Sequence, residues 1–236
     1  MLSACAIVPA FDAAATVRGV VRDLRASLDV PVIVVDDGSA DCTADVARDE
    51  GAIVLRHHVN CGKGAAIRTG LGEALRQGLR LAVTVDADGQ HPAAAVRSVL
   101  HGSDNPRALV LGVRDLFRDG APRSNRFGNG VSNFFLSRFA QRALRDTQCG
   151  LRRYPVDETL ALGSRADGFA FEGEVLLRAL AQGLPLVEVP VAVVYPPEQD
   201  RRSHFHRVLD PTRIVGTVVQ TVLELRLRPG RKGRRR

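Results

Sequence analysis

The stretch that decides the fold class is AVTVDADGQHP, which occupies residues 82–92. An apolar, largely β-branched run from 81 to 85 stops at Asp86, and Asp88 and Gln90 follow directly. A short apolar run bounded by turn-forming residues predicts a buried strand, and this one ends in carboxylates. Open α/β sheets hold their ligands beyond the carboxyl ends of such strands. We therefore expect a functional site immediately after this strand.

The residues themselves leave two interpretations of this stretch open. Asp86, Asp88 and Gln90 offer the oxygen ligands that hard cations such as Mg²⁺ or Mn²⁺ prefer, and these ions also bridge phosphate oxygens. In that interpretation the stretch is a metal–diphosphate site. The alternative is a polar turn after a core strand, because Asp and Gly are common turn residues.

Length and composition are those of one globular domain. The 236 residues suffice for a sizeable α/β domain with a full core, and 45% of them are hydrophobic. No uncharged apolar stretch reaches the roughly 17–25 residues that a membrane span needs. The first residues lack a charged leader with a long apolar core, so no signal peptide is expected. We expect a cytoplasmic protein.

The four cysteines are scattered, at positions 5, 42, 61 and 149. They form no CxxC pair and have no matching His spacing, so the sequence indicates neither a zinc site nor a disulfide framework. Reduced thiols are expected.

The formal net charge of +7 is concentrated at one end of the chain. The basic residues of this end are Arg226, Arg228, Arg231, Lys232, Arg234, Arg235 and Arg236. Without them the remaining body has a formal net charge of zero, so its surface is not expected to bind nucleic acid. A basic tail of this kind is typically solvated and disordered, and it can also contact anionic lipid.

Strand and helix patterns alternate along the chain. Strands are expected at 5–9, 30–35, 52–56, 81–85, 108–113 and 186–194, and helices between the early strands and at 93–100, 123–142 and 175–182. The strand at 186–194 contains Pro190, which favours a sheet edge. Alternation with short links predicts parallel βαβ units in a right-handed, doubly wound sheet.

The glycine-rich segment at 60–64, NCGKG, is not a P-loop. A P-loop would need Gly where this chain has His57, and Ser or Thr where it has Gly64. Lys63 at a helix N-terminus either meets a phosphate or is a solvated lysine beside a turn.

A C-terminal amphipathic helix is expected at 211–225, since Asp210 and Pro211 suit a helix start. Its apolar stripe consists of Ile214, Val215, Val218, Val219, Val222 and Leu223. Such a stripe either packs on the domain or, followed by basic residues, lies on an anionic membrane surface.

Eight stretches carry a family resemblance: IVPAFDAAATV at 7–17, VIVVDDGSADCT at 32–43, NCGKGAAIRTGL at 60–71, VDADGQHP at 85–92, DTQCGLR at 146–152, FEGEVLLRALAQG at 171–183, VEVPVAVVY at 187–195 and RRSHF at 201–205. In this order they resemble family 2 glycosyltransferases, in particular the polyprenyl-phosphate branch that includes dolichol-phosphate mannose synthase.

The resemblance implies a glycosyltransferase A-type, Rossmann-like fold in which a mostly parallel sheet is flanked by helices. It implies a catalytic domain over 1–210, the amphipathic helix at 211–225 and a disordered tail at 226–236. It also implies a nucleotide-diphosphate sugar as donor and Mg²⁺ or Mn²⁺ as cofactor.

By similarity, the nucleotide-sugar site comprises Pro9, Phe11, Val35, Asp37, Lys63, Asp86, Ala87, Asp88 and Gln90, with Asp37 accepting a hydrogen bond from the base. Asp86, Asp88 and Gln90 would hold the metal ion. Arg114, Arg126 and Arg202 match positions that face donor or acceptor phosphates, and with Asp88 they form the expected catalytic set.

Two departures from the family pattern matter. The family usually has Tyr-Asn-Glu where this chain has Phe11, Asp12 and Ala13, so the nucleotide base is left open between UDP- and GDP-sugars. Many relatives carry C-terminal transmembrane helices. Here the amphipathic helix and basic tail predict peripheral contact at the cytoplasmic face of a membrane.

The implied reaction is metal-dependent, inverting sugar transfer to a polyprenyl or dolichyl phosphate. An acceptor phosphate monoester has a second pKa of about 6 and attacks without a strong base. A hydroxyl acceptor, as in cell-surface glycan synthesis, would need a carboxylate base such as Glu172 or Glu174. A third interpretation is a non-catalytic protein whose basic tail binds a membrane or nucleic acid.

Overall fold

The structure is a computed structural model that describes residues 3–116, 123–195 and 209–227. In two helices the described side chains are fewer, beginning at 129 in the first and covering 216–225 in the second. Arg202 and the basic residues from 228 onward lie outside the described residues.

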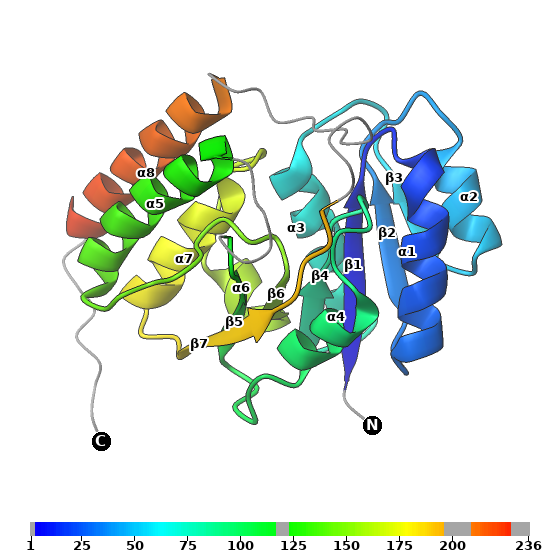
Figure 1. The fold of residues 1–236 in the computed structure, drawn as a ribbon, viewed down its shortest axis with the longest axis horizontal. Helices are drawn as coiled ribbons and strands as arrows, with labels where there is room; N and C mark the ends of the chain where they lie inside the picture. The colour runs from blue at the N-terminus through cyan, green and yellow to red at the C-terminus, as the bar shows by residue number, and fades with distance from the viewer. Residues whose placement is uncertain (1–2, 117–122, 196–208, 228–236) are drawn as a thin grey trace.

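The described residues form one seven-stranded sheet with helices on both faces (Figure 1). The strands are β1 (Ala4–Ala10), β2 (Val32–Asp36), β3 (Ile53–Arg56), β4 (Leu81–Thr84), β5 (Leu109–Arg114), β6 (Arg152–Pro155) and β7 (Leu186–Val191). The helices are α1 (Ala14–Ser27), α2 (Thr43–Asp49), α3 (Lys63–Arg76), α4 (Ala93–Leu100), α5 (Arg123–Ala140), α6 (Val156–Ala161), α7 (Phe171–Ala181) and α8 (Leu209–Leu227).

The strand order is β3-β2-β1-β4-β6-β5-β7, and the predicted mostly parallel sheet is confirmed. β1 pairs in parallel with β2 and with β4, so the carboxyl ends of these three strands share one edge. β7 lies at the end of the sheet beside β5, as Pro190 predicted. The carboxylates that follow β2 and β4 therefore project from the same edge.

β6 was not predicted, and it is the antiparallel strand of the sheet. It pairs with both β4 and β5. Its sequence begins with Arg152 and Arg153, which are polar on both faces and give no strand pattern. Both side chains are nevertheless buried, because their guanidinium groups donate to backbone carbonyls, among them Thr147 and Glu172 for the first and Leu100 and Ser103 for the second.

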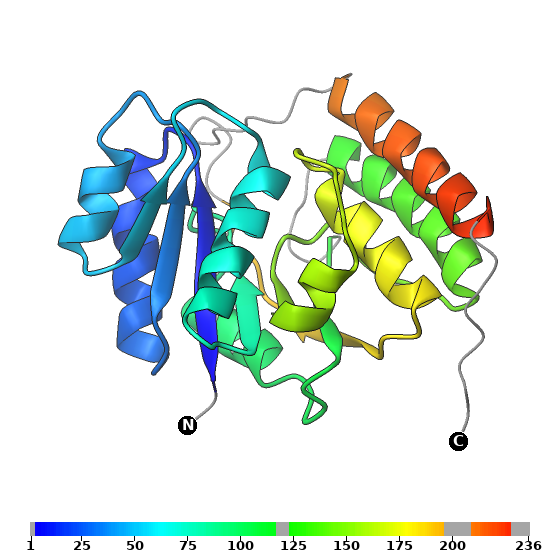
Figure 2. The same ribbon diagram turned by 180° about the vertical axis from the view of Figure 1, so that it is seen from behind.

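Two hydrophobic cores lie on opposite faces of the sheet. The first contains the apolar sides of α1, α2 and α4, which stand in front of the sheet in Figure 1. The second contains those of α3, α6 and α7, with Leu136 of α5, and α3 comes to the front in Figure 2. Burial of the apolar stripe of each helix is what holds the layers together.

α8 confirms the predicted C-terminal helix. One part of its apolar stripe packs on the domain, and another part is exposed. Val218 and Val222 pack on the second core, whereas Val219 and Leu223 are exposed. α8 packs on α7, and its Glu224 accepts a hydrogen bond from Arg178 of that helix. Among the described helices, none is both long enough and apolar enough to cross a bilayer.

Candidate active site

Carboxylates from two strands define the candidate site. Asp36 ends β2 and Asp37 follows it, while Asp86 and Asp88 follow β4. Because β1 alone separates β2 from β4, the two groups stand about 10 Å apart across the sheet edge. The site therefore has two parts, one after β2 and one after β4.

The first turn of α3 delivers a cation to the part after β4. Nζ of Lys63 lies 2.7 Å from Oδ1 of Asp86 and 2.9 Å from Oε1 of Glu172, which belongs to α7. Only 15% of the Lys63 side chain is exposed, so it is not the solvated lysine that the sequence left open. Burial disfavours its charge, but the two carboxylates outweigh burial and raise the pKa of Lys63 above its usual range. In return, Lys63 holds the pKa of Asp86 below its usual range against the effect of burial.

Glycines let the backbone close around this lysine. A Cβ on Gly64 would lie 2.5 Å from the carbonyl oxygen of Ala166, and Gly62 has a φ of +93° that favours glycine. A Cβ on Gly150 would lie 2.6 Å from Oδ2 of Asp86 and 2.7 Å from Nζ of Lys63. The backbone at Gly150 thus forms one wall of the ion pair.

Asp88 is the exposed carboxylate of the pair after β4. Its Oδ1 accepts a hydrogen bond of 3.0 Å from the backbone N–H of Gln90. Partial loss of hydration, and repulsion from Asp86, raise the pKa of Asp88 to about 6. Ala87 between them is buried and holds the turn to the core.

These residues fit a hard divalent cation. The set is made of carboxylate and amide oxygens, the ligands that Mg²⁺ and Mn²⁺ select. Asp86 is buttressed by Lys63 on one side and by the Gly150 backbone on another, so its orientation is fixed before any ion arrives. Asp86 and Asp88 repel each other, which contributes to the raised pKa of Asp88, and a bound cation would offset this repulsion.

Arg114, at the end of β5, is held by a buried carboxylate. Its Nε and Nη2 donate to the two oxygens of Asp146 at 2.7 and 3.0 Å, and Asp146 is 1% exposed. This bidentate pair raises the pKa of Arg114 against burial. Asn133 of α5 braces the same segment by accepting from the N–H of Thr147. Arg126 belongs to α5, but its side chain is outside the described residues.

His91 was missed by the sequence analysis although it lies in the opening stretch. Burial holds its pKa at about 4, with the charge of Asp86 opposing and that of Arg114 adding to the shift. Its Nδ1 is buried and has no hydrogen-bond partner among the described residues. A neutral imidazole is thus available beside the carboxylates.

The part of the site after β2 is built around Asp37. Its oxygens accept hydrogen bonds from the backbone N–H groups of Cys61 and Gly62, and Nδ1 of His57 lies 2.6 Å away. Pro9 and Val35 are buried and face each other in register on β1 and β2, and Phe11 follows β1. The structure therefore brings together the residues predicted for the nucleoside.

The two glutamates of α7 have different surroundings. Glu174 accepts from the N–H groups of Arg165 and Ala166 and from Nε of Arg178, so its carboxylate is committed to structure. Glu172 instead contacts Lys63, and through it Asp86. Of the two glutamates, only Glu172 belongs to the described site.

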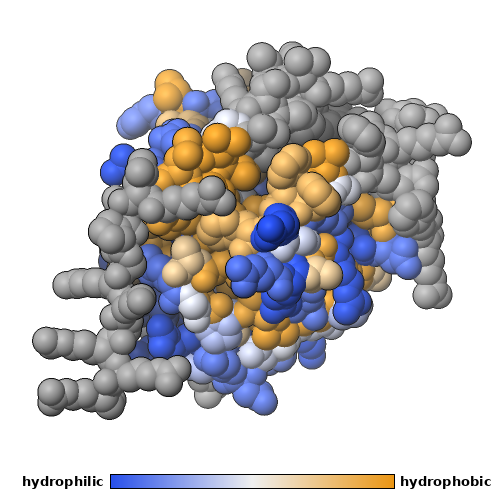
Figure 3. Space-filling model, turned by 90° about the vertical axis from the view of Figure 1, so that its left-hand side faces the viewer, coloured by the Kyte–Doolittle hydropathy of each residue, from blue (hydrophilic) through white to orange (hydrophobic). Residues whose placement is uncertain are grey.

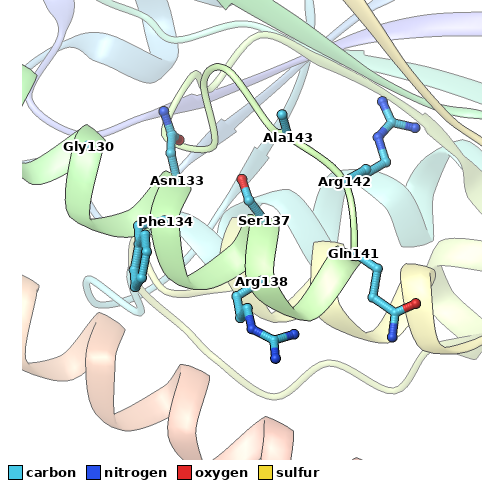
Figure 4. A pocket seen from close by; sticks show the side chains of 8 residues that line it. All are labelled: Gly130, Asn133, Phe134, Ser137, Arg138, Gln141, Arg142 and Ala143. Carbon is cyan, nitrogen blue, oxygen red and sulfur yellow. The ribbon is translucent and has the colours of Figure 1, made fainter.

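A shallow groove of about 630 Å³ lies along α5 (Figure 4). It is lined by Gly130, Asn133, Phe134, Ser137, Arg138, Gln141, Arg142 and Ala143. None of the residues predicted for the donor or the metal lines it. The groove therefore belongs to the face of α5 and not to the carboxylate site.

Comparisons with known proteins show the family of the chain. The sequence model of Glycosyl transferase family 2 matches residues 5–156. An uncharacterized protein of Methanocaldococcus jannaschii is 31% identical over 199 residues, which cover 80% of this chain and 80% of that protein. The UDP-N-acetylglucosamine–dolichyl-phosphate N-acetylglucosaminyltransferase of Methanococcus voltae is 28% identical over 213 residues, covering 80% of this chain and 84% of the relative. Polyprenol monophosphomannose synthase of Mycolicibacterium smegmatis is 31% identical over 180 residues, covering 69% and 66%.

Solved structures share the fold. Glucosyl-3-phosphoglycerate synthase from Mycobacterium tuberculosis, in complex with Mg²⁺ and uridine diphosphate, superposes with a TM-score of 0.71 at 20% identity, covering 97% of this chain and 80% of that one. Its complex with Mn²⁺, uridine diphosphate and glucosyl-3-phosphoglycerate gives 0.69 at the same identity, covering 97% and 81%. The fold is thus the glycosyltransferase A type. Since the family match spans more than half of the chain, this protein belongs to glycosyl transferase family 2 and is a glycosyltransferase.

Proposed function

We propose that this enzyme transfers a sugar from a UDP- or GDP-sugar to a polyprenyl phosphate, with Mg²⁺ or Mn²⁺ bound at Asp86, Asp88 and Gln90. The observation that carries the proposal is the Asp86–Asp88 pair after β4, with the braced cation Arg114 ending β5. The carboxylates suit a metal-bound diphosphate and the guanidinium suits a second phosphate. Relatives named as dolichyl-phosphate and polyprenol transferases support the same acceptor class.

The donor would lie across both parts of the site. Pro9, Phe11, Val35 and Asp37 would surround the nucleoside, about 10 Å from the carboxylates that face its diphosphate. Lys63 and Ala87 would complete this nucleotide-sugar site. The cofactor, when bound, would neutralise the charge that develops on the departing nucleoside diphosphate.

The acceptor phosphate would perform the displacement directly. One of its ionised oxygens forms the new bond to the anomeric carbon, while the bond from that carbon to the diphosphate oxygen breaks and its electron pair leaves with the diphosphate. Attack from the opposite face inverts the centre. Arg114 would orient the acceptor through Nη1, since Nε and Nη2 are used by Asp146 within the described residues. Arg126 and Arg202 complete the proposed phosphate contacts.

An apolar face supports a lipid acceptor. α5 and α8 run side by side in Figures 1 and 2, and Figure 3 shows hydrophobic atoms gathered on that side. Phe134 and Phe135 are 68% and 58% exposed, and Val219 and Leu223 are each 53% exposed. An apolar patch on a helix that basic residues follow in the sequence fits the surface of an anionic membrane. In this proposal the domain of residues 1–210 contacts the cytoplasmic face peripherally through the helix at 211–225 and the tail at 226–236.

The test is a transfer assay with a panel of UDP- and GDP-sugars, with and without Mn²⁺ or Mg²⁺ and a short-chain polyprenyl phosphate in detergent. We expect metal-dependent product only when the lipid phosphate is present. Product with a hydroxyl acceptor of the same chain length would instead favour the alternative, in which Glu172 acts as the base. No transfer with any donor would contradict the proposal.

Asp88→Ala tests the metal assignment separately. Because Asp88 is exposed, its replacement opens no cavity in the core, so the variant should fold and lose turnover. Retained metal-dependent transfer would show that the cation is held elsewhere.

A further inference from the structure

Three potential metal ligands of different chemistry meet at the end of β2. They are Asp37, which is buried, His57 after β3, and Cys61, which is exposed in the loop before α3. One oxygen, one nitrogen and the sulfur of these residues all lie within 4.8 Å of one another. A tetrahedral ion with bonds near 2.0–2.3 Å needs ligand atoms roughly 3–4 Å apart, so the three atoms already lie near the spacing that such an ion requires.

The surroundings of the cluster orient its members. Nε2 of His57 lies 2.9 Å from Oγ1 of Thr69, which fixes the ring. The backbone N–H groups of Cys61 and Gly62 donate to the two oxygens of Asp37 at 2.9 and 2.7 Å. Thr69 and these two N–H groups thus supply the outer-shell hydrogen bonds that orient the ligands of metal sites.

We propose that Asp37, His57 and Cys61 bind a zinc-class divalent ion, at a site distinct from the one that takes Mg²⁺ or Mn²⁺. Thiolate and imidazole select Zn²⁺ over the hard cations, whereas Asp86, Asp88 and Gln90 offer oxygen only. The exposed thiol gives the ion a path of entry and leaves a fourth position for water. The spacing of His57 and Cys61 does not reveal this site, because the third ligand, Asp37, comes from a separate segment after β2.

Binding of the ion releases one proton, that of the Cys61 thiol. The Cys61 thiol, whose sulfur lies 3.3 Å from the carbonyl oxygen of Val59, gives up its proton to solvent and bonds as thiolate. His57 binds through Nδ1 as the tautomer that carries its proton on Nε2, and this N–H donates a hydrogen bond to Oγ1 of Thr69. The ion takes the place of the 2.6 Å contact between Nδ1 and Asp37.

The ion would compete with the donor substrate. This consequence rests on the proposed function, in which Asp37 accepts a hydrogen bond from the nucleotide base. An ion on Oδ1 of Asp37 removes that acceptor and occupies the space before α3. Zinc is therefore an inhibitor competitive with the nucleotide sugar, while Mg²⁺ and Mn²⁺ remain activators.

Cobalt titration of the full chain tests the site directly, because Co²⁺ replaces Zn²⁺ and a bound thiolate gives a sulfur-to-cobalt charge-transfer band. We expect one equivalent of Co²⁺ to bind with this band and one equivalent of Zn²⁺ to displace it. Cys61→Ser should abolish the band and His57→Gln should weaken binding more than about 100-fold, since even an outer-shell loss costs 10–100-fold. The matched control Cys42→Ser, which removes the other exposed thiol, should bind as the wild type.

A band that survives in Cys61→Ser, or the lack of a stoichiometric band in the wild type, overturns the site. Circular dichroism of each variant excludes misfolding as the cause. Competition is measured separately by adding uridine or guanosine to the cobalt complex, because these nucleosides carry the base without the phosphates that would bind Co²⁺ themselves. Co²⁺ that binds but is not displaced by either nucleoside overturns the competition and the proposed place of the base, while the metal site stands.

Discussion

Nζ of Lys63 lies 2.7 Å from Oδ1 of Asp86, so a carboxylate proposed to bind a metal ion already has an internal counter-ion. The same ammonium lies 2.9 Å from Glu172. One cation thus fixes the orientation of two acids from different elements, and it keeps Asp86 ionised in a partly buried site.

Replacing Lys63 by Met removes this counter-ion and should raise the pKa of Asp86. An opposite charge at this distance lowers a carboxyl pKa by roughly 1–3 units, so the acidic limb of kcat/KM should move up by about that amount. The measurement is a pH profile of transfer for the wild type, Lys63→Met and Lys63→Arg. The arginine variant keeps the charge and should shift least. Superimposable profiles for all three would show that Lys63 does not set the ionisation of Asp86.

Gly150→Ala should disturb the same pair sterically. Its Cβ would lie 2.6 Å from Oδ2 of Asp86 and 2.7 Å from Nζ of Lys63, closer than atoms approach without displacement. We expect transfer to fall at least about tenfold, because a displacement of this size misplaces a ligand of the reacting diphosphate. Gly72→Ala on α3 is the matched control, since nothing lies within 4 Å of the added methyl. That variant should retain activity and gain up to about 1 kcal/mol of stability. Equal activity of both alanine variants would show that close packing at Gly150 does not position Asp86 and Lys63.

Asp88 should make stability depend on pH in the absence of metal. Folding raises its pKa from 3.8 to about 6, so the folded state binds the proton more tightly than the unfolded state. Its contribution to stability is therefore lost as the pH rises from about 4 to 6. Asp88→Asn removes this loss, and its free energy of unfolding should exceed that of the wild type by more at pH 7 than at pH 4. Urea denaturation in EDTA at several pH values measures the free energy of unfolding of both proteins. A difference between the two proteins that does not change with pH would contradict the prediction.

The four thiols should divide into two classes. Burial raises the pKa of Cys5 and of Cys149 to about 12, so both stay protonated and inaccessible near neutral pH. Cys42 and Cys61 are exposed. A thiol reagent should modify two cysteines of the native protein quickly and all four after denaturation. Rapid reaction of a third thiol in the native state would show that one of the cores opens.

The local pattern of the sequence determined most of the fold. Short apolar runs predicted the strands β1 to β5, and α4 begins and ends at the predicted residues, 93 and 100. Pro190 placed β7 at the edge because proline cannot donate to a neighbouring strand. The carboxylates that directly follow β2 and β4 in the sequence predicted the edge of the sheet at which the site lies. These features depend on periodicity and turn residues, which a short window of sequence contains.

Tertiary structure alone decided which groups meet. β6 could not be predicted because Arg152 and Arg153 look solvent-exposed in sequence, and only the folded backbone supplies the carbonyls that satisfy them. The pairing of Lys63 with Glu172 and that of Arg114 with Asp146 join segments far apart in the chain. Their free energy arises when the sheet order brings the segments together in a poorly hydrated site. The sequence therefore determined the elements and the family, whereas packing decided the counter-ions of the site and the soft ligands around Asp37.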